Sequence, residues 1–504
     1  MTERTSIARL RDSAKKALPL ILVLLGSAML RLTYLDYSHF QGDELSALYP
    51  IGIAFPDSLI EQLKGPIQLI VTLVVRLITG GYEEWQTRLP FSLASLINVY
   101  IVYLFVRDIY GQRAALWAGA LTGSCGLLVA FGRIVQYQAF VMLAVSLTAL
   151  FLQRWILKDE PRYLYLGLVS YAFGVLAHYD SLTFLPALLL LLVVGFRSRE
   201  KWTPTRLRHV ALASALALFI ACLFYVPFIF RPGFASVTEY LQGRVVGGSK
   251  RATFIQTYQL LNLYLPPLYE KIIGALIVVG STTVLLSKTR AFVLAVLAWF
   301  GAPFVFYMFL GGDPRSHIYM YVLPGMILAA IGIDVLISIP KSHFFARATQ
   351  ATAWATIIAF AAITYYMLVD HTIEHPWERK TVLGYELPNL VTSYIQGVFG
   401  FPYRRGLEQV GELFRSGEFV GSFGSNERYS TVEYYFEATR SSPPVTYFDD
   451  PGSSPPDYYF YVYRPFSLRR GLPVTVKDTY RFVGTISEGC RRTIDIYAAP
   501  WKEP

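Results

Sequence analysis

Two adjacent carboxylates, Asp43 and Glu44, stand directly after the first long apolar run of the chain. The run covers residues 18–35, and Gly42 precedes the acidic pair. An ionised carboxylate beside a bilayer is costly unless it is solvated or used, and glycine lets the backbone approach a ligand closely. A carboxylate placed there could take the proton of an incoming hydroxyl as a general base. The alternative interpretation is a pair of solvated loop acids, which is common.

A second group of residues could bind an anion, above all the phosphate of a lipid. Lys64 stands just before a Gly-Pro pair, and Arg133 stands at the end of a later apolar run. A cation at headgroup depth can meet a lipid phosphate, and the planar fork of arginine matches phosphate geometry. The alternative for both is an ordinary basic side chain whose charge extends to the membrane surface.

Polar residues also interrupt an almost continuous apolar stretch at His178, Tyr179 and Asp180. Two helices joined by so few residues form a tight hairpin, and polar groups at such a corner could face a central cavity. The alternative is a plain hairpin turn, for which aspartate is well suited.

A second tight loop, over residues 311–318, ends in a similar group of polar side chains. Arg315 and His317 lie within it, and Tyr319 follows directly. Arg315 offers the guanidinium that suits a phosphate, whereas the alternative is a proline-containing turn with solvated residues. Candidate phosphate ligands therefore occur at the ends of several apolar runs.

The composition indicates which solvent surrounds the elements that position these residues. The chain has 504 residues, of which 54% are hydrophobic and only 16% are charged. A soluble domain usually has about a quarter charged residues, so the deficit points to lipid. The three cysteines, Cys125, Cys222 and Cys490, are too few and too scattered for a disulfide framework or a metal-ligand cluster.

Apolar runs of about 20 residues, the length that crosses the hydrocarbon core, recur along the chain. Residues 66–79 are shorter and are interrupted by polar side chains, so they predict a helix lying in the membrane interface. The longer runs predict about eleven spanning helices, at residues 18–35, 92–106, 114–131, 137–156, 163–178, 182–196, 210–230, 267–286, 291–310, 319–339 and 350–369.

The basic residues indicate the orientation of these helices. The net charge is +10, and Lys and Arg cluster in alternate short loops, which is the positive-inside pattern with a cytoplasmic N-terminus. Nucleic acid as a partner is excluded on this interpretation. Residues 36–91 then form an external loop with the acidic pair and a short helix at 57–64, and residues 231–266 form a second long external loop.

The composition changes after residue 369. Residues 370–504 are richer in proline, glycine, serine and charge, and they predict a small soluble α/β domain outside the membrane, following a catalytic membrane domain over residues 1–369. Its periodicity predicts a helix and three strands, at residues 406–416, 419–423, 458–463 and 493–497.

Common nucleotide and hydrolase motifs are absent from the sequence: it has no Walker motif, no GxGxxG after a strand, no GxSxG and no HExxH. A transferase that uses a cytosolic nucleotide sugar needs a soluble nucleotide-binding domain on the inside, and the predicted cytoplasmic loops are too short to build one. A donor carried by the membrane lipid is therefore the better substrate.

Taken together, these features resemble the integral-membrane glycosyltransferases of the GT-C superfamily. The branch is the family 39-like one, related to protein O-mannosyltransferases and to the aminoarabinose transferase that modifies lipid A. The resemblance covers roughly residues 18–340, and it is carried by Gly42-Asp43-Glu44, Lys64-Gly65-Pro66-Ile67, Arg88-Leu89-Pro90, Gly132-Arg133, Ala177-His178-Tyr179 and Arg315 through Pro324.

The resemblance implies a polytopic α-helical protein of a bacterial cell membrane that transfers a monosaccharide with inversion. The donor is a sugar on a polyprenyl phosphate, and the acceptor is a hydroxyl of a glycan, lipid or protein. Asp43 matches the catalytic base of the family, and Glu44 stands beside it. The positions suited to the donor phosphate are Lys64, Arg133, His178, Tyr179, Arg315, His317 and Tyr319.

One departure from the family pattern concerns a second acid. Many relatives carry one shortly after the arginine of the third span, where this chain has Gln138, and no Asp or Glu occurs between Asp108 and Asp159. Glu44 and Asp180 are the candidates to replace it, and a divalent cation as cofactor stays open.

Two other functions stay open beside the transferase. A transporter or flippase for a lipid-linked glycan would tend to place ionisable groups at mid-bilayer and to show pseudo-symmetric halves, whereas the charges here stand at membrane ends. A non-catalytic protein of glycan assembly would keep the fold without the chemistry.

Overall fold

Contacts in the computed structural model divide the chain into two compact units. The helical unit consists of Met1–Leu35 and Tyr49–Phe401, and the sheet unit consists of Asp36–Leu48 and Pro402–Pro504. The boundary expected between residues 369 and 370 stays a prediction. The structure describes residues 2–50, 59, 64–197, 203–231, 234–235, 238–239, 242, 250–286, 289–310, 315–382, 384–387, 398–436, 455–465 and 471–502.

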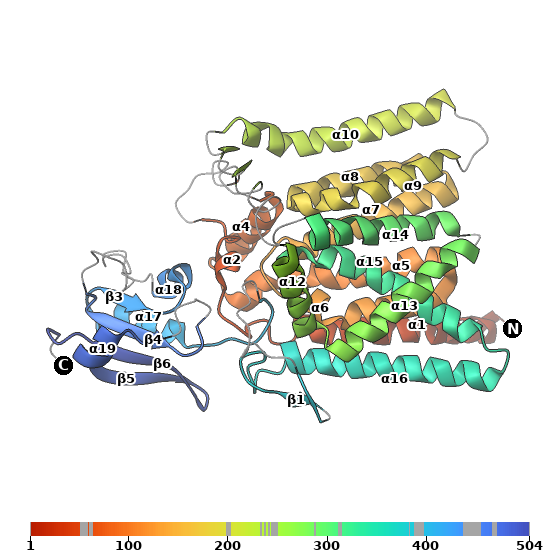
Figure 1. The fold of residues 1–504 in the computed structure, drawn as a ribbon. Helices are drawn as coiled ribbons and strands as arrows, with labels where there is room; N and C mark the ends of the chain where they lie inside the picture. Colours follow the sequence, from red (N-terminus) through yellow and green to blue (C-terminus); the bar gives the residue numbers. More distant parts are fainter. Residues whose placement is uncertain are drawn as a thin grey trace. The chain divides into compact units, whose positions relative to one another are not determined.

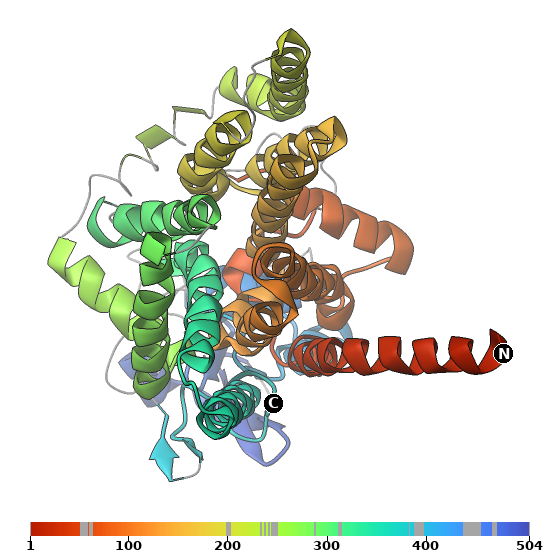
Figure 2. The ribbon, with the colours of Figure 1, turned by 90° about the vertical axis from the view of Figure 1, so that its right-hand side faces the viewer.

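Most of the long helices of the helical unit run side by side, while α12 runs across them (Figures 1 and 2). The helices are α1 (Thr2–Leu32), α4 (Ile67–Thr79), α5 (Glu84–Ser124), α6 (Gly126–Gly132), α7 (Gln138–Lys158), α8 (Pro161–Ala177), α9 (Leu185–Arg197), α10 (Pro204–Ile229), α12 (Lys250–Tyr264), α13 (Pro267–Leu286), α14 (Arg290–Val305), α15 (Tyr319–Ser338) and α16 (His343–Leu368). Short helical turns connect some of them, η1 (Tyr179–Phe184), η2 (Phe306–Leu310) and η3 (Arg315–His317), and β1 (Thr381–Val382) pairs with β2 (Tyr385–Glu386).

Many of these helices have the length and composition of membrane spans. Among the described residues, seven helices could cross a membrane, or eight if the bent pair Thr257–Tyr264 and Pro267–Thr283 forms one span. The fold is therefore that of a polytopic α-helical membrane protein, as predicted, and the number of about eleven spans stays a prediction.

Burial separates interior helices from helices that face lipid. In α15 83% of the apolar window is buried inside the protein, whereas in α10 the figure is 17%. Both helices are apolar around most of their circumference, which a helix surrounded by water could not be. Helix α10 accordingly lies at the outer edge of the bundle in Figure 1, and α15 packs against α5, α13 and α14.

The span predicted at 92–106 and the first part of the span predicted at 114–131 fall within one long element, α5, and most of the remainder of the second span lies in α6. Helix α5 runs on across a break at Gly111, where φ is +83° and ψ is 179°. Only glycine adopts this combination without steric cost, so the break is encoded by the residue type. The chain changes direction there and continues into α6.

The sheet unit contains a four-stranded mixed sheet in the order β3-β4-β6-β5. Strand β3 (Phe423–Ser425) pairs parallel with β4 (Tyr458–Val462), which pairs antiparallel with β6 (Arg491–Ala498), and β6 pairs antiparallel with β5 (Arg481–Glu488). The described part of the sheet unit also contains four helices, of which α2 is a single turn: α2 (Gly42–Leu45), α17 (Leu407–Arg415), α18 (Tyr429–Phe436) and α19 (Val474–Thr479). A small α/β fold is therefore present, as predicted.

Most predicted elements of the tail and of the first loop have a counterpart in the structure. The helix expected at 66–79 is α4, the helix at 406–416 is α17, and the strands at 458–463 and 493–497 are β4 and β6. Strand β5 was not predicted, because its side chains are mostly exposed and do not alternate. The loop expected over 231–266 contains α12, and the helix expected at 57–64 and the loop over 311–314 lie largely outside the described residues.

Candidate functional site

A buried carboxylate, Asp180, lies at the corner between α8 and η1 of the helical unit and is 1% exposed. Tyr307 donates a hydrogen bond to its Oδ1 at 3.0 Å. Tyr319 and His317 Nδ1 donate to its Oδ2 at 2.8 and 2.7 Å. Because a buried charge is stable only when its lone pairs are satisfied, this ring of donors allows the carboxylate to stay inside the protein.

Local structure brings these donors together. Helix α8 ends at His178, whose backbone is extended (φ −168°, ψ 149°), and the His178 Nδ1 accepts a hydrogen bond from the Asp180 N–H at 3.1 Å. The single turn η3 ends at His317 and α15 begins at Tyr319, so both side chains start from the same corner. Tyr307 comes from the π-helical turn η2 after α14, and such wide turns are frequent at functional sites.

Aromatic rings extend the cluster on one side. The Tyr137 ring stacks on the His178 ring, with centroids 3.7 Å apart and planes inclined by 7°. The Lys64 Nζ lies over the Tyr137 ring at 5.2 Å from the centroid, a distance at which a cation is attracted by the ring face. On the other side, the Tyr307 and His317 rings stack with centroids 5.4 Å apart.

Gly65 explains how Lys64 reaches this corner. A Cβ on Gly65 would lie 1.8 Å from the carbonyl oxygen of Leu176 in the last turn of α8. Only a residue without a side chain permits this approach, so the Lys64-Gly65 pair of the sequence is a packing requirement at the end of α8. The structure thus gathers five of the predicted phosphate-site residues around Asp180: Lys64, His178, Tyr179, His317 and Tyr319.

Two members of this cluster, Tyr137 and Tyr307, were not predicted from the sequence. Asp180 was predicted as part of a polar corner that could face a cavity and as a candidate to replace a second acid, but not as the centre of the cluster. Tyr137 follows the polar break after Arg133, which was a usable signal. Tyr307 lies in an unbroken apolar run, and tyrosine in such a run is typical of a membrane interface, so no local signal distinguished it.

Arg133 is buried and holds the end of α1. Its guanidinium donates to the carbonyl oxygens of Leu30, Thr33 and Tyr34, each at 2.9 Å. The last carbonyls of a helix have no partner within the helix, and a cation there also opposes the helix dipole. These contacts give Arg133 a structural role, while its part in binding a phosphate stays a prediction. The side chain of Arg315 lies outside the described part of the structure.

The predicted catalytic acids lie in the sheet unit, in the short helix α2. Glu44 is fully buried, and its Oε2 accepts a hydrogen bond from the Gln41 N–H at 3.1 Å. In a capping box, the side chain of the third helical residue makes this contact with the backbone of the N-cap residue. Asp43 is half-buried in the first turn. Glu44 therefore stabilises the turn on which Asp43 stands, and the role of both in catalysis stays a prediction.

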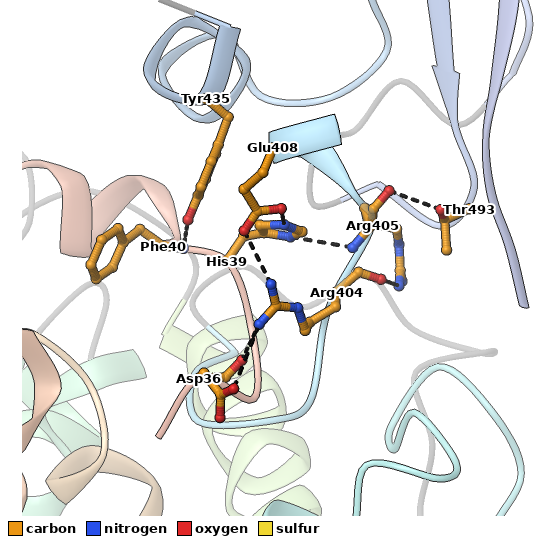
Figure 3. A network of polar contacts seen from close by, with 8 residues as sticks. All are labelled: Asp36, His39, Phe40, Arg404, Arg405, Glu408, Tyr435 and Thr493. Carbon is orange, nitrogen blue, oxygen red and sulfur yellow. Dashed lines mark hydrogen bonds and ion pairs between the residues drawn. The ribbon is translucent and has the colours of Figure 1, made fainter. Parts of the chain in front are cut away.

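A network of polar contacts attaches the segment Asp36–Leu48 to the rest of the sheet unit (Figure 3). The Arg405 N–H donates to the His39 Nδ1 at 3.2 Å, and the His39 Nε2 lies 2.6 Å from the Glu408 Oε2. Since Nδ1 accepts, Nε2 carries the proton and donates it to the carboxylate. The histidine is 1% exposed, so it is a fixed bridge between the segment and α17.

Further contacts hold the same segment on both sides of His39. The Phe40 N–H donates to the Tyr435 hydroxyl at 2.7 Å, and Arg404 donates to the carbonyl oxygen of Asp36 at 2.9 Å and to the Glu408 Oε1 at 3.2 Å. Burial alone would raise the pKa of Glu408, but the hydrogen bond from His39 and electrostatic attraction to His39 and Arg404 lower it to about 2. The carboxylate is therefore ionised at neutral pH and ties the Asp43 segment to α17.

Comparisons with known proteins agree with this architecture. Residues 66–225 match the sequence model of the family described as dolichyl-phosphate-mannose-protein mannosyltransferase. Comparison with curated protein sequences gives no match.

Solved structures with a similar fold include ArnT from Cupriavidus metallidurans in the apo state, with a TM-score of 0.56 and 14% identity over 97% of this chain and 98% of that one. ArnT bound to undecaprenyl phosphate matches with a TM-score of 0.56 and 15% identity over 97% and 99%. The archaeal oligosaccharyltransferase AglB from Archaeoglobus fulgidus, in complex with an inhibitory peptide and a dolichol-phosphate, matches with a TM-score of 0.53 and 13% identity over 98% and 75%. The predicted resemblance is confirmed for the fold, over 97–98% of this chain, and for the family model over residues 66–225.

Proposed function

We propose that this chain is an inverting membrane glycosyltransferase. It moves a monosaccharide from a polyprenyl-phosphate donor to a hydroxyl of a glycan, lipid or protein, on the exported side of the cell membrane. The observation that carries the proposal is the gathering of Lys64, His178 and His317 at one corner of a GT-C fold. The similar structures include proteins bound to undecaprenyl phosphate and to dolichol-phosphate.

The reaction needs one proton acceptor and one stabilised leaving group. The acceptor oxygen attacks the anomeric carbon, the bond from that carbon to the phosphate oxygen breaks, and the polyprenyl phosphate leaves with the electron pair. Asp43 takes the proton of the attacking hydroxyl, which is general-base catalysis. Donors and cations aimed at the phosphate stabilise the charge that develops on it.

Residues at the Asp180 corner divide this second task. Lys64 supplies a positive charge, held over the Tyr137 ring at 5.2 Å. The Asp180 Oδ2 lies 2.7 Å from the His317 Nδ1, and this contact fixes the orientation of the imidazole. Tyr307 and Tyr319 keep the carboxylate in place, as the orienting partners of a catalytic histidine do.

The substitution Asp43→Asn tests the base. We expect the transfer rate to fall by about 10²- to 10⁴-fold, the usual contribution of a general base, with little change in stability because Asp43 is half-buried. Purified protein, a radiolabelled polyprenyl-phosphate sugar and a hydroxyl acceptor give the rate. Asp478→Asn, at an exposed position of α19, is the matched control and should keep full activity.

The same assay separates the transferase from a transporter. Transfer breaks the bond between sugar and phosphate, whereas a flippase leaves the lipid-linked sugar intact. A wild-type rate for Asp43→Asn would refute the assignment of the base. Recovery of only intact donor from the wild-type protein, with every acceptor class supplied, would refute the transferase itself.

A further inference from the structure

Three metal-ligating side chains meet at the Asp180 corner. His178, Asp180 and His317 each offer one ligand atom, and these atoms lie within 4.8 Å of one another. His178 Nδ1 is 3.0 Å from the Asp180 Oδ1, and His317 Nδ1 is 2.7 Å from the Asp180 Oδ2. All three residues are at most 5% exposed, so the group is an enclosed set of two imidazoles and a carboxylate.

The contacts of His178 make opposite demands on its Nδ1. The Asp180 N–H points at this nitrogen at 3.1 Å and therefore requires a lone pair on it. The Asp180 Oδ1 lies 3.0 Å from the same nitrogen, and a carboxylate oxygen facing a lone pair is repulsive. A cation between Nδ1 and Oδ1 would replace the repulsion of these two atoms by two coordination bonds, and it would take the Nδ1 lone pair from the Asp180 N–H.

The charge balance of the cluster also favours a cation. Within the described part of the chain, both ion-pair partners of Asp180 inside 4.0 Å are histidines. A buried carboxylate is stabilised further by positive charge placed directly beside it. A divalent ion would offset this charge.

We propose that His178, Asp180 and His317 bind one divalent transition-metal ion, with Zn²⁺ as the best fit. Imidazole and carboxylate ligands suit Zn²⁺, with Zn–N of about 2.0–2.1 Å and Zn–O of about 2.0–2.2 Å. The His178 Nδ1 and the Asp180 Oδ1, 3.0 Å apart, would meet at such an ion at an angle of roughly 90°. The three ligand atoms, which lie within 4.8 Å of one another, must move closer together to share one ion.

Binding needs a tautomer change in His317, release of the His178 Nδ1 from the Asp180 N–H, and a small movement of the ligand atoms toward one another. The Nδ1 proton, now donated to Asp180, moves to Nε2, and the Nδ1 lone pair becomes the ligand. Tyr307 and Tyr319 already hydrogen-bond to the carboxylate, and partners of this kind orient metal ligands. The ion ties the α8–η1 corner to the start of α15, and three protein ligands leave a position for water.

Metal analysis of the purified full chain tests the site without any transferase assay. The protein carries a histidine-free affinity tag, is stripped with a chelator, is incubated with Zn²⁺, and is freed of unbound ion before elemental mass spectrometry. We expect about one Zn²⁺ per chain, as for a three-ligand site. His317→Ala and Asp180→Asn should lower this to about a tenth, while His343→Ala, at an exposed position of α16, should retain it.

Because both variants also remove hydrogen bonds from a buried cluster, the wild-type protein decides independently of their folding. Its melting temperature should rise with added Zn²⁺, and bound Co²⁺ should give a visible absorption band that Zn²⁺ displaces. A wild-type chain that retains no Zn²⁺ would overturn the proposal, as would a folded His317→Ala that retains the full equivalent. Since the readout is metal content, failure here leaves the test of Asp43 unaffected.

Discussion

Each of the two units contains a carboxylate hydrogen-bonded to a buried histidine, and the two pairs differ in their surroundings. In the helical unit the Asp180 side chain is 1% exposed, and its partners are imidazoles and tyrosine hydroxyls. In the sheet unit the Glu408 side chain is 35% exposed, and Arg404 shares it with His39. The distances to the histidine nitrogen are nearly equal, 2.7 Å and 2.6 Å.

The difference in surroundings separates two functions of the same chemical pair. Glu408 has a permanent cation beside it and water on one side, so it serves as a tie between the Asp43 segment and α17. Among the described residues, the ion-pair partners of Asp180 within 4.0 Å are imidazoles, and tyrosine hydroxyls donate to it as well, and such groups could also hold a ligand. A buried ionisable pair without a neighbouring opposite charge is more often part of a functional site than a pair whose charge is neutralised by an adjacent side chain.

The largest effect should come from removing the buried charge. Asp180→Asn keeps the shape of the side chain but places an amide N–H where a donor already points. We therefore expect the free energy of unfolding to fall by about 3 kcal/mol, the cost of broken buried hydrogen bonds. Thermal unfolding of the purified protein measures it. Asp334→Asn, in a partly exposed pair with Arg113, is the control and should cost no more than about 1 kcal/mol. Equal losses would erase the distinction between buried and compensated carboxylates.

A smaller effect should follow from neutralising the carboxylate of the sheet unit. Glu408→Gln keeps an acceptor for His39 but loses the charge that attracts Arg404. We therefore expect the free energy of unfolding to fall by about 1 kcal/mol. The effect is this small because a third of the side chain is exposed to water. Glu412→Gln lies on the same helix at an exposed position and should be neutral. Proteolysis within Asp36–Leu48 should become faster in Glu408→Gln alone, and an unchanged rate would contradict the role as a tie.

The smallest effect should be the pH dependence of that tie. The pKa of Glu408 is lowered to about 2 in the folded protein, against about 4.3 in an unfolded chain. A group with a depressed pKa stabilises the fold above its unfolded pKa and loses this contribution as the pH falls toward the folded value. The stability difference between wild type and Glu408→Gln should therefore be constant above about pH 5 and shrink between about pH 4 and pH 2. A difference that grows on acidification would have the wrong sign.

Much of the fold follows from local patterns. The apolar runs predict the long helices because a helix in lipid must satisfy its own backbone and bury apolar side chains all round. The amphipathic spacing of Leu407, Val410 and Phe414 predicts α17, and those three side chains are buried in the structure. Strand β5 escaped prediction because most of its side chains are exposed, so burial imposes no alternation on its sequence.

The candidate site was predicted only in part, for a related reason. His178 and His317 are recognisable in the sequence because each is a polar residue at the end of an apolar run. Tyr307 carries no such signal, because a tyrosine fits an apolar run as well as a polar corner. Arg133 shows what a charge alone does not reveal: carbonyls at the end of α1 accept hydrogen bonds from its guanidinium, while its predicted part in binding a phosphate stays a prediction.

The sequence by itself determined that this chain is a polytopic helical membrane protein with a small α/β region, because hydropathy and periodicity act over about 20 residues at a time. Only the tertiary structure decided that Asp180 and His317, 137 residues apart, form one site. The tertiary structure alone also brought His39 to Glu408, which is 369 residues away in the sequence. That contact attaches the Asp43 segment to the sheet unit. Pairings of this kind depend on which buried polar groups find partners, and no local pattern encodes the choice.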